Sequence, residues 1–398
     1  MRIVCCVLFA SVLYFSASAQ IIPKKFGDGI QLYGKDSSYF LHFGFRFQTL
    51  FTNSWTNISG NLTDHRASLL IRRSRLKFDG YAVDPRLTYK FELALSNNDM
   101  SGGDGEEHAN ASNIVLDASM SYNFYKNFSI QFGQGKLPGN RERVISSANL
   151  QFVDRSRLNS RFNIDRDVGF QLKHHFTTGK RFLIREVFAF SQGEGRNVTQ
   201  GHFGGFDYTF RVEFLPFGSF KSKGDYSGSA LERESKPKLS VGFTYDVDAH
   251  AVREHGQLGS FIRDVAGNYY GRTLNTFFAD CMFKYQGWSV MAEYADKRTG
   301  SQNSLVFDPA GNLIGTYYTG SAYVIDLGYL FANNWEIAGR YCALSPDAGV
   351  ANDEKEYTLG VSKFIVGHKL KIQTDLSYRD VADRNGQLSW RLQTELHF

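Results

Sequence analysis

The stretch 132–166 concentrates the side chains that could recognise a charged ligand. From Lys136 onward it holds seven basic and three acidic residues, a local net charge of +4. The basic residues are Lys136, Arg141, Arg143, Arg155, Arg157, Arg161 and Arg166, and the acidic residues are Glu142, Asp154 and Asp165. Arginine donates two parallel hydrogen bonds from a planar fork, and rings of Arg or Lys select anions in pores. The stretch therefore predicts anion recognition or, alternatively, ion pairs within the stretch that only fix its shape.

Other reactive residues show no comparable pattern. His174 and His175 are adjacent on a predicted strand, so their side chains point to opposite faces and cannot share a metal ion. Asp246, Asp248 and the acidic segment 99–107 lack the Asp-rich spacing and closing Glu of a calcium-binding helix–loop–helix, and we expect solvated loops there. No serine stands in a nucleophile-elbow context, and no Gly-rich phosphate loop opens a helix. We therefore predict no enzyme activity, no metal site and no cofactor.

The segments that must position these residues alternate apolar and polar side chains. In 39–51, apolar positions face one side while Arg46 and Gln48 face the other. In 70–81, Leu76 and Phe78 point away from a face that carries Arg73, Arg75 and Lys77. A strand with one wholly apolar face can cross a bilayer with about 9–11 residues. This alternation is typical of a transmembrane β-barrel.

The same alternation recurs along the whole chain. An aromatic content of 15%, 38 Gly and only seven Pro, without a long apolar block, also favour a barrel. Strands are predicted at 39–51, 70–81, 86–96, 116–124, 128–133, 167–176, 181–191, 204–215, 238–247, 273–286, 288–297, 318–331, 333–343, 355–366, 368–379 and 388–398. Short and long connections alternate, which predicts an all-β transmembrane antiparallel barrel of about 16 strands with a long third loop folded into the lumen. The connection 217–237 is long where a short turn is expected, and the sequence gives no reason for it.

The chain ends indicate export and assembly in the outer membrane. Residues 1–19 combine Arg2, an apolar run and Ala17-Ser18-Ala19, which predicts a signal peptide cleaved before Gln20 and a barrel domain over 20–398. The apolar run is too short to span a membrane as a helix. The terminal Phe398 closes an alternating strand and resembles the assembly signal of outer-membrane barrels.

Two further properties limit the alternatives. Cys281 and Cys342 fall on different predicted strands, and their side chains point in opposite directions, so we expect no disulfide between them. Removal of Arg2 with the signal peptide leaves a net charge of +4, which is too small and too dispersed to suggest nucleic acid binding.

Two motifs stand out, one on a predicted strand and one at the start of the third loop. The first is Arg72-Arg73-Ser74-Arg75-Leu76-Lys77-Phe78-Asp79-Gly80. The second is Gly133-Gln134-Gly135-Lys136-Leu137-Pro138, followed by Glu142, Ser146-Ser147, Leu150-Gln151-Phe152 and Arg155-Ser156. With these motifs the chain resembles the family of phosphate-selective porins O and P. One departure is Gly139-Asn140, where the family pattern has Phe-Gly.

The resemblance implies that the third loop forms a constriction and that basic residues line an anion path. The residues that match are Arg73, Arg75 and Lys77 on the wall and Lys136, Arg141, Arg143, Arg155 and Arg157 on the loop. It also implies a homotrimer in the outer membrane of a Gram-negative bacterium, in contact with membrane lipid, that passes small anions such as phosphate.

The remaining inward positions qualify this interpretation. Acidic residues occupy the predicted inner face of other strands, at Asp117, Glu213, Asp280, Glu293, Asp326, Glu336, Asp375 and Glu395. A basic wall that faces acidic walls produces a transverse field, which orients polar solutes without admitting only anions.

We therefore predict a passive outer-membrane porin that prefers anions, with phosphate or polyphosphate as candidate solutes. A general non-selective porin for small polar solutes is the alternative. A barrel enzyme, such as a lipase or protease, would need a Ser, His and acid set at outward or rim positions, which are almost wholly apolar here. An adhesin that uses the connections 248–272 and 298–317 is compatible with the pore.

Overall fold

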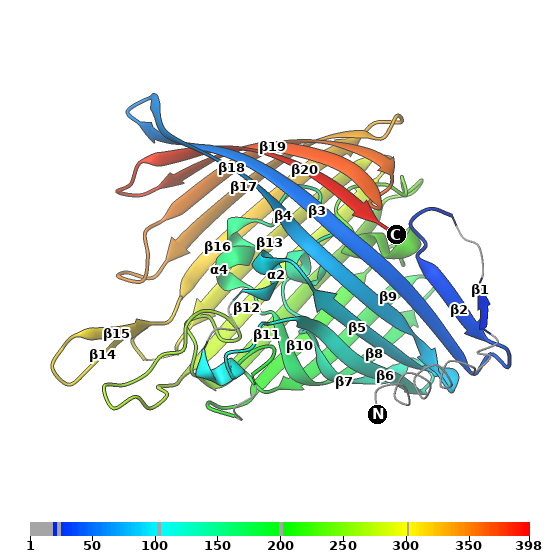
Figure 1. Ribbon diagram of the computed structural model, residues 1–398, viewed down its shortest axis with the longest axis horizontal. Helices are drawn as coiled ribbons and strands as arrows, with labels where there is room; N and C mark the ends of the chain where they lie inside the picture. Colours follow the sequence, from blue (N-terminus) through cyan, green and yellow to red (C-terminus); the bar gives the residue numbers. More distant parts are fainter. Residues whose placement is uncertain (1–18, 22–24, 102–104, 199–201, 301) are drawn as a thin grey trace, which may run out of the picture.

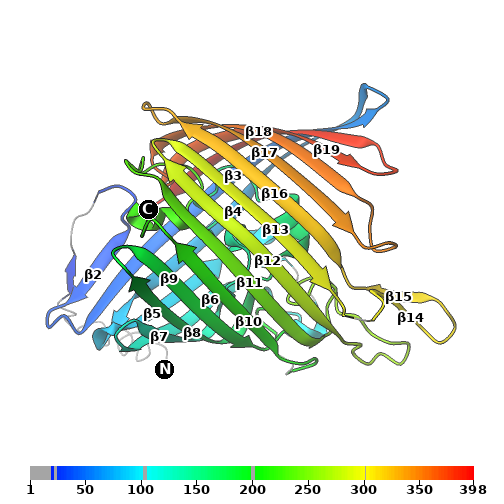
Figure 2. The same ribbon diagram turned by 180° about the vertical axis from the view of Figure 1, so that it is seen from behind.

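The computed structural model describes residues 19–21, 25–101, 105–198, 202–300 and 302–398. Within them, 16 antiparallel strands form a closed barrel (Figures 1 and 2). The strands are β3 (Tyr39–Ile58), β4 (Asn61–Ala82), β5 (Asp84–Ala94), β6 (Val115–Tyr125), β7 (Phe128–Lys136), β8 (Arg166–Thr178), β9 (Phe182–Ser191), β10 (Asp207–Leu215), β11 (Lys238–Ala251), β12 (Arg272–Tyr285), β13 (Trp288–Arg298), β16 (Gly320–Leu330), β17 (Trp335–Pro346), β18 (Glu354–Val366), β19 (Leu370–Val381) and β20 (Gly386–His397). Each pairs with the next, and β20 closes the ring by pairing with Arg46–Asn57 of β3. The predicted strand number and direction are confirmed.

Alternation along each strand sorts the side chains between the two faces of the sheet. On β16, Val324 and Asp326 are buried, whereas Tyr323 and Ile325 are 44% and 48% exposed. Exposed apolar side chains on the outer face are what a lipid environment requires, because closure of the sheet satisfies every spanning backbone group. No helix in the described residues is long and apolar enough to cross a membrane.

Short strands complete the sheet outside the ring. β2 (Ile30–Gly34) pairs with Phe40–Phe43 of β3, next to the end of β20, and β1 (Ala19–Ile21) pairs with β2. β14 (Leu305–Phe307) and β15 (Leu313–Thr316) form a hairpin that projects beyond the rim (Figure 2). Apart from Ala19, the predicted signal peptide lies outside the described residues.

Five short helical segments lie in the described parts of the connections. They are α2 (Asn97–Met100) and η2 (Glu106–His108) between β5 and β6, α3 (Arg141–Val144) and α4 (Arg157–Phe162) between β7 and β8, and η3 (Lys221–Tyr226) between β10 and β11. The Ser156 side chain caps α4 by accepting a hydrogen bond from the Asn159 backbone N–H at 3.1 Å. The third loop is therefore ordered by local structure of its own.

Apolar side chains of this loop pack against the inner face of the sheet. Leu158 and Phe162 of α4 join a buried cluster with Phe278, Val324 and Cys342. A second cluster holds Ile145, Leu150, Leu183, Leu215, Phe220, Met282 and Met291. Phe220 comes from the connection 216–237, so the long segment that the sequence left unexplained packs beside the third loop. Cys281 and Cys342 are both free thiols, as expected.

Candidate functional site

The third loop, residues 137–165, contacts strands at widely separated positions of the ring. Arg46 of β3 donates to the Ser147 hydroxyl at 2.9 Å. On β19, Lys371 donates to the Ala148 carbonyl at 2.8 Å. Across the ring, Arg141 of the loop donates to Asp280 of β12 at 2.8 Å.

The acidic residues of the inner wall accept hydrogen bonds from the loop and from neighbouring strands. Arg141, with no exposed surface, bonds to Asp280 and to Glu213 at 3.1 Å. Arg340 bonds both to its strand neighbour Asp326 and to Glu142 of the loop. All eight inward carboxylates named from the sequence are at most 4% exposed; they are Asp117, Glu213, Asp280, Glu293, Asp326, Glu336, Asp375 and Glu395. The transverse field expected from an open acidic wall is therefore reduced, because this wall is covered, six of these carboxylates form ion pairs, and Glu293 and Glu336 accept hydrogen bonds from neutral groups.

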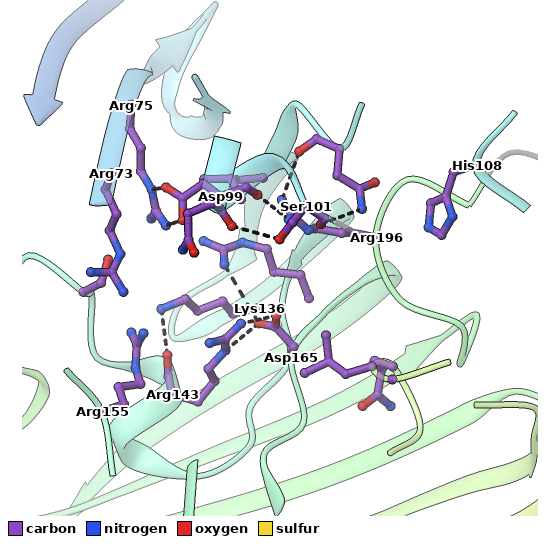
Figure 3. Close-up of a pocket in the computed structure, with 18 of the residues that line it drawn as sticks. Arg73, Arg75, Asp99, Ser101, His108, Lys136, Arg143, Arg155, Asp165 and Arg196 are labelled. Atoms are coloured by element: carbon purple, nitrogen blue, oxygen red, sulfur yellow. Dashed lines mark hydrogen bonds and ion pairs between the residues drawn. The ribbon is translucent and has the colours of Figure 1, made fainter. Parts of the chain in front are cut away.

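The basic wall borders a cavity of about 560 Å³ beside the loop (Figure 3). Strand β4, the third loop and the connections 95–114, 192–206 and 252–271 all contribute to it. Among the described residues, nine cationic side chains line it, namely Arg72, Arg73, Arg75, Lys136, Arg143, Arg155, Arg166, Arg196 and Arg253. The carboxylates in its lining are Asp99 and Asp165. The cavity therefore carries a large excess of positive charge.

Several of these cations bond to backbone carbonyls, which leave their charge uncompensated. Lys136 donates to the carbonyls of Arg143, Val144 and Ile145 at 2.7, 3.2 and 3.1 Å. Arg155 donates to the Glu142 and Ile145 carbonyls at 2.9 and 2.7 Å. These two side chains hold the start of the loop in place and also present positive charge to the cavity.

Connections above the barrel supply two further cations of this kind. Arg196 donates to the Asp99 carbonyl at 2.7 Å, and Arg253 to the Glu194 carbonyl at 2.6 Å. Burial lowers the pKa of each of the two guanidinium groups to about 10. Burial, with repulsion from Arg143 and Arg73, likewise holds the pKa of Arg155 well below its ordinary value. The lowered pKa values indicate that the positive charges are costly where they stand, and an anion in the cavity would stabilise them.

Ion pairs hold the remaining cavity cations in position. Arg143 pairs with Asp165 of the same loop. Arg72 and Arg73 meet Asp154 at 2.9 and 3.5 Å. Burial raises the pKa of Asp154, but the effect of these two arginines is larger and brings the pKa down to about 2. This carboxylate is therefore ionised at neutral pH.

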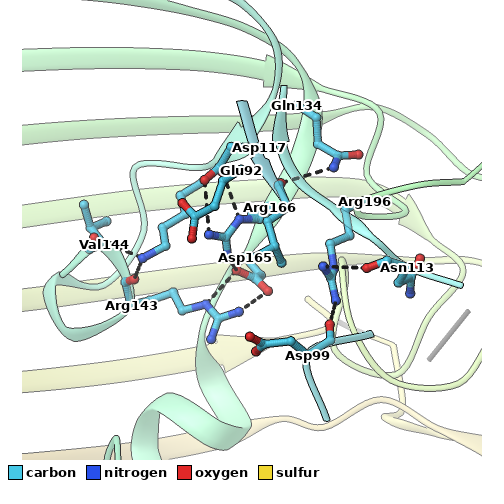
Figure 4. Close-up of polar contacts among 12 residues, drawn as sticks. Glu92, Asp99, Asn113, Asp117, Gln134, Arg143, Val144, Asp165, Arg166 and Arg196 are labelled. Carbon is cyan, nitrogen blue, oxygen red and sulfur yellow. Dashed lines mark hydrogen bonds and ion pairs between the residues drawn. The ribbon is translucent and has the colours of Figure 1, made fainter. Parts of the chain in front are cut away.

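A second cavity, of about 420 Å³, continues along the same wall between β4 and β7. It shares Arg75, Lys136, Ser147 and Arg166 with the first, and these residues mark the junction between the two. Figure 4 shows Arg166 directed at Asp117, 2.9 Å from its guanidinium Nε. The second cavity also contains Lys90, Glu92 and Asp117, so its charges are more nearly balanced.

The structure divides the eight residues predicted from the sequence. Five line the first cavity: Arg73, Arg75, Lys136, Arg143 and Arg155. The other three lie outside both cavities: Lys77 pairs with Asp79 at 2.9 Å, Arg141 is fully buried, and Arg157 pairs with Glu354.

Four cavity cations were not among the predicted site residues. Arg72 stands at a β-bulge, where Gln48 pairs with Arg73 and the next residue of β3 pairs with Ile71, so Arg72 and Arg73 both reach Asp154. The adjacent arginines were a usable signal of such a bulge. Arg166 was counted in the loop charge but not assigned to the site. Arg196 and Arg253 come from connections whose course the alternation pattern does not predict.

A closed barrel with an apolar outer belt, short turns on one rim and long connections on the other is the architecture of outer-membrane porins. The chain belongs to the family of phosphate-selective porins O and P, whose sequence profile matches residues 44–394. No curated protein is a significant match in sequence.

Solved porin structures share the fold at low sequence identity. Salmonella typhi OmpF in complex with daunomycin is 12% identical, with 92% of this chain and 100% of that chain covered and a TM-score of 0.56. The anion-selective porin from Comamonas acidovorans is 12% identical, with 90% and 100% covered and a TM-score of 0.51. OmpT of Vibrio cholerae in its trimer form is 11% identical, with 90% and 99% covered and a TM-score of 0.50.

Proposed function

We propose that this outer-membrane porin is a passive channel that prefers anions. The proposal rests on one observation, the nine cations and two carboxylates that line the first cavity. Burial of the inward carboxylates elsewhere in the barrel supports it, because a permeant ion then meets mainly the basic wall. Family and fold also point to a channel rather than to an enzyme.

In this proposal, the third loop lies in the lumen and narrows the path. Its contacts with β3, β12 and β19 support the inward course, since a segment that reaches strands far apart in the ring must cross the interior. Permeant solutes pass between the loop and the wall formed by β4 to β8, through the junction at Arg75, Lys136, Ser147 and Arg166.

The predicted site residues then take two roles. Arg73, Arg75, Lys136, Arg143 and Arg155 attract anions to the path. Buried Arg141 and paired Arg157 anchor the loop to the acidic wall, which was the alternative role considered for the basic stretch. Lys77, about one-third exposed and paired with Asp79, adds to the charge of the wall.

Phosphate is the candidate solute because of the family name and the chemistry of arginine. A guanidinium fork donates two parallel hydrogen bonds to a phosphate, and several converge on one cavity here. In a planar bilayer containing the purified protein, millimolar phosphate should reduce the chloride current at constant ionic strength. If sulfate and phosphate reduce the current equally, the channel recognises divalent anions in general.

The described lining of the second cavity has four cations and two carboxylates, so it is less strongly basic than that of the first, and this favours an alternative, a general porin for small polar solutes. The reversal potential under a potassium chloride gradient separates the two functions. A reversal potential near the equilibrium potential of chloride supports an anion channel, and a reversal potential near zero supports the general porin.

We also propose a homotrimer and a cleaved signal peptide. The trimer form of OmpT, which shares the fold, is the precedent for the first. Native mass spectrometry of protein purified from outer membranes should give three copies, each starting at Gln20. A monomer, or a chain that retains residues 1–19, would contradict the respective proposal.

A further inference from the structure

A group of buried carboxylates that line neither cavity lies at the rim that carries the long connections, next to Gln257 of the first cavity. Asp246 and Asp248 follow each other on the inner face of β11, and Asp207 of β10 is the register partner of Asp248. All three are at most 1% exposed. The expectation that Asp246 and Asp248 lie in solvated loops is wrong, because β11 extends to Ala251 and neighbouring connections cover it.

Several oxygen atoms in this group lack a hydrogen-bond partner among the described residues. They include both carboxylate oxygens of Asp248, Oδ1 of Asp207, Oε1 of Gln257 and the hydroxyl oxygen of Thr276. The amide of Gln257 is held at the group, because its Nε2 donates to Asp207 Oδ2 at 2.8 Å. Gln257 is only 2% exposed, so its carbonyl oxygen is a buried acceptor without a donor among the described residues.

Neighbouring groups do not supply enough positive charge. Asp167 and Glu194 lie near but are satisfied by backbone N–H donors, at 2.6 Å from Gly193 and 2.7 Å from Gly204. Lys297 lies two strands from Asp246, in register with Thr276 between them, and its Nζ donates to the His255 carbonyl at 2.9 Å. In the part of the chain that the structure describes, one ammonium group therefore faces three buried carboxylates.

We propose that Asp207, Asp246, Asp248 and Gln257 bind a calcium ion. Carboxylate and amide oxygens are the ligands that calcium prefers, and its flexible coordination suits an irregular set better than the strict octahedron of magnesium. No three His, Cys, Asp or Glu side chains in the described residues are already spaced to hold a metal ion. The unbonded Asp248 carboxylate is the group that must turn to complete the site.

Because of the position of the site, a bound ion would also hold the neighbouring connections in place. An added Cβ at Gly193 or Gly256 would lie 3.0 or 2.9 Å from an oxygen of Asp248, so both connections pass directly over this carboxylate. Gln257 belongs to the connection 252–271, and so does the cavity residue Arg253. Bound calcium would therefore tie this connection to β10 and β11 and hold Arg253 over the first cavity, whether or not the channel prefers anions.

Titration calorimetry of the mature barrel in detergent tests the proposal. After treatment with a chelator, the parent protein is titrated with calcium chloride and, separately, with magnesium chloride. The variants are Asp248→Asn, which removes one ligand charge at constant size, and Asp347→Asn, which makes the same change on an exposed connection. We expect one calcium site in the parent and in Asp347→Asn, at least tenfold weaker binding in Asp248→Asn, and weaker binding of magnesium than of calcium.

Thermal unfolding in chelator provides the second measurement. Without calcium, Asp248→Asn should be at least as stable as the parent, because the substitution removes one of three mutually repelling carboxylates. Calcium should raise the unfolding temperature of the parent and of Asp347→Asn but not that of Asp248→Asn. Failure of the parent to bind calcium, equal binding by Asp248→Asn, or lower stability of this variant in chelator would each overturn the proposal.

Discussion

Replacement of Arg155 by glutamine tests the source of the charge preference most directly. The Arg155 side chain lines the first cavity and donates to two backbone carbonyls, so its removal takes away one positive charge without releasing a paired carboxylate. Glutamine retains a donor for the carbonyl of Glu142 or Ile145. Anion preference should therefore fall while the loop stays in place.

The size of the effect follows from the dimensions of the cavity. A sphere of 560 Å³ has a radius of about 5 Å, which puts a guanidinium in its wall roughly 8 Å from an ion at the centre. At an effective dielectric constant of about 20, two unit charges at this distance interact by roughly 2 kcal/mol. Screening over a Debye length of about 10 Å at about 0.1 M salt leaves roughly 1 kcal/mol. Anion occupancy of the cavity should thus fall about fivefold.

The reversal potential of single channels under a salt gradient measures this change. Arg384→Gln is the matched control, because Arg384 is exposed on the connection 382–385 and lines neither cavity. Arg155→Gln should move the reversal potential toward zero, most strongly at low ionic strength, and Arg384→Gln should leave it unchanged. Equal shifts in the two variants would show that overall charge sets the preference and that the cavity has been given the wrong role.

Three further predictions concern anchoring and assembly. Arg141→Gln leaves Asp280 with Arg211 alone and Glu213 with Arg211 and Arg185, so it should destabilise the barrel by about 3–5 kcal/mol and lower the heat-modifiable fraction on gels, whereas exposed Lys221→Gln should not. Deletion of Phe398, whose backbone pairs with Phe45 at 2.7 and 3.0 Å, should reduce the amount of assembled barrel but not the conductance per pore; unchanged assembly would show the terminal residue to be incidental. Asp154 has a pKa lowered to about 2, so the stability that it contributes is complete above about pH 4 and is lost as the pH falls through 2. The loss of unfolding free energy caused by Asp154→Asn should therefore be constant from pH 7 to 4 in denaturant titrations and disappear as the pH falls through 2, and a decline already at pH 5 would assign the pH dependence to another group.

The barrel could be predicted from the sequence because its physics is local. Outer faces must be apolar in lipid, so Tyr323 and Ile325 alternate with Val324 and Asp326 in a way that a single strand reveals. The same alternation placed Arg73 and Arg75 on the inner wall, where both line the first cavity. The side-chain direction of strand residues follows from the two-residue period, so it could be predicted from the sequence.

The positions of residues in the connections could not be predicted from the sequence, because they depend on the course of each connection. Arg141 and Arg143 are two positions apart and chemically identical, yet one is buried against Asp280 and the other lines the cavity. Their separation follows from the short helix α3, which turns one toward β12 and the other toward Asp165. Arg196 and Arg253 reach the cavity only because their connections bend over the barrel, which no periodic pattern encodes.

The acidic wall shows why a tally of inward charges misjudges the electrostatics of such a lumen. Counted from strands alone, carboxylates such as Asp280 and Asp326 oppose the arginines of β4 and suggest weak selectivity. In the folded chain Asp280 binds Arg141 of the loop, and Asp326 binds Arg340, whose guanidinium also binds Glu142 of the loop. Both carboxylates are therefore paired within the contacts that hold the loop. The cations of the cavity bond in part to backbone carbonyls, which neutralise no charge. Selectivity can therefore arise in a lumen of nearly balanced composition, because the fold pairs the charges of one wall and leaves those of the other exposed to the solute.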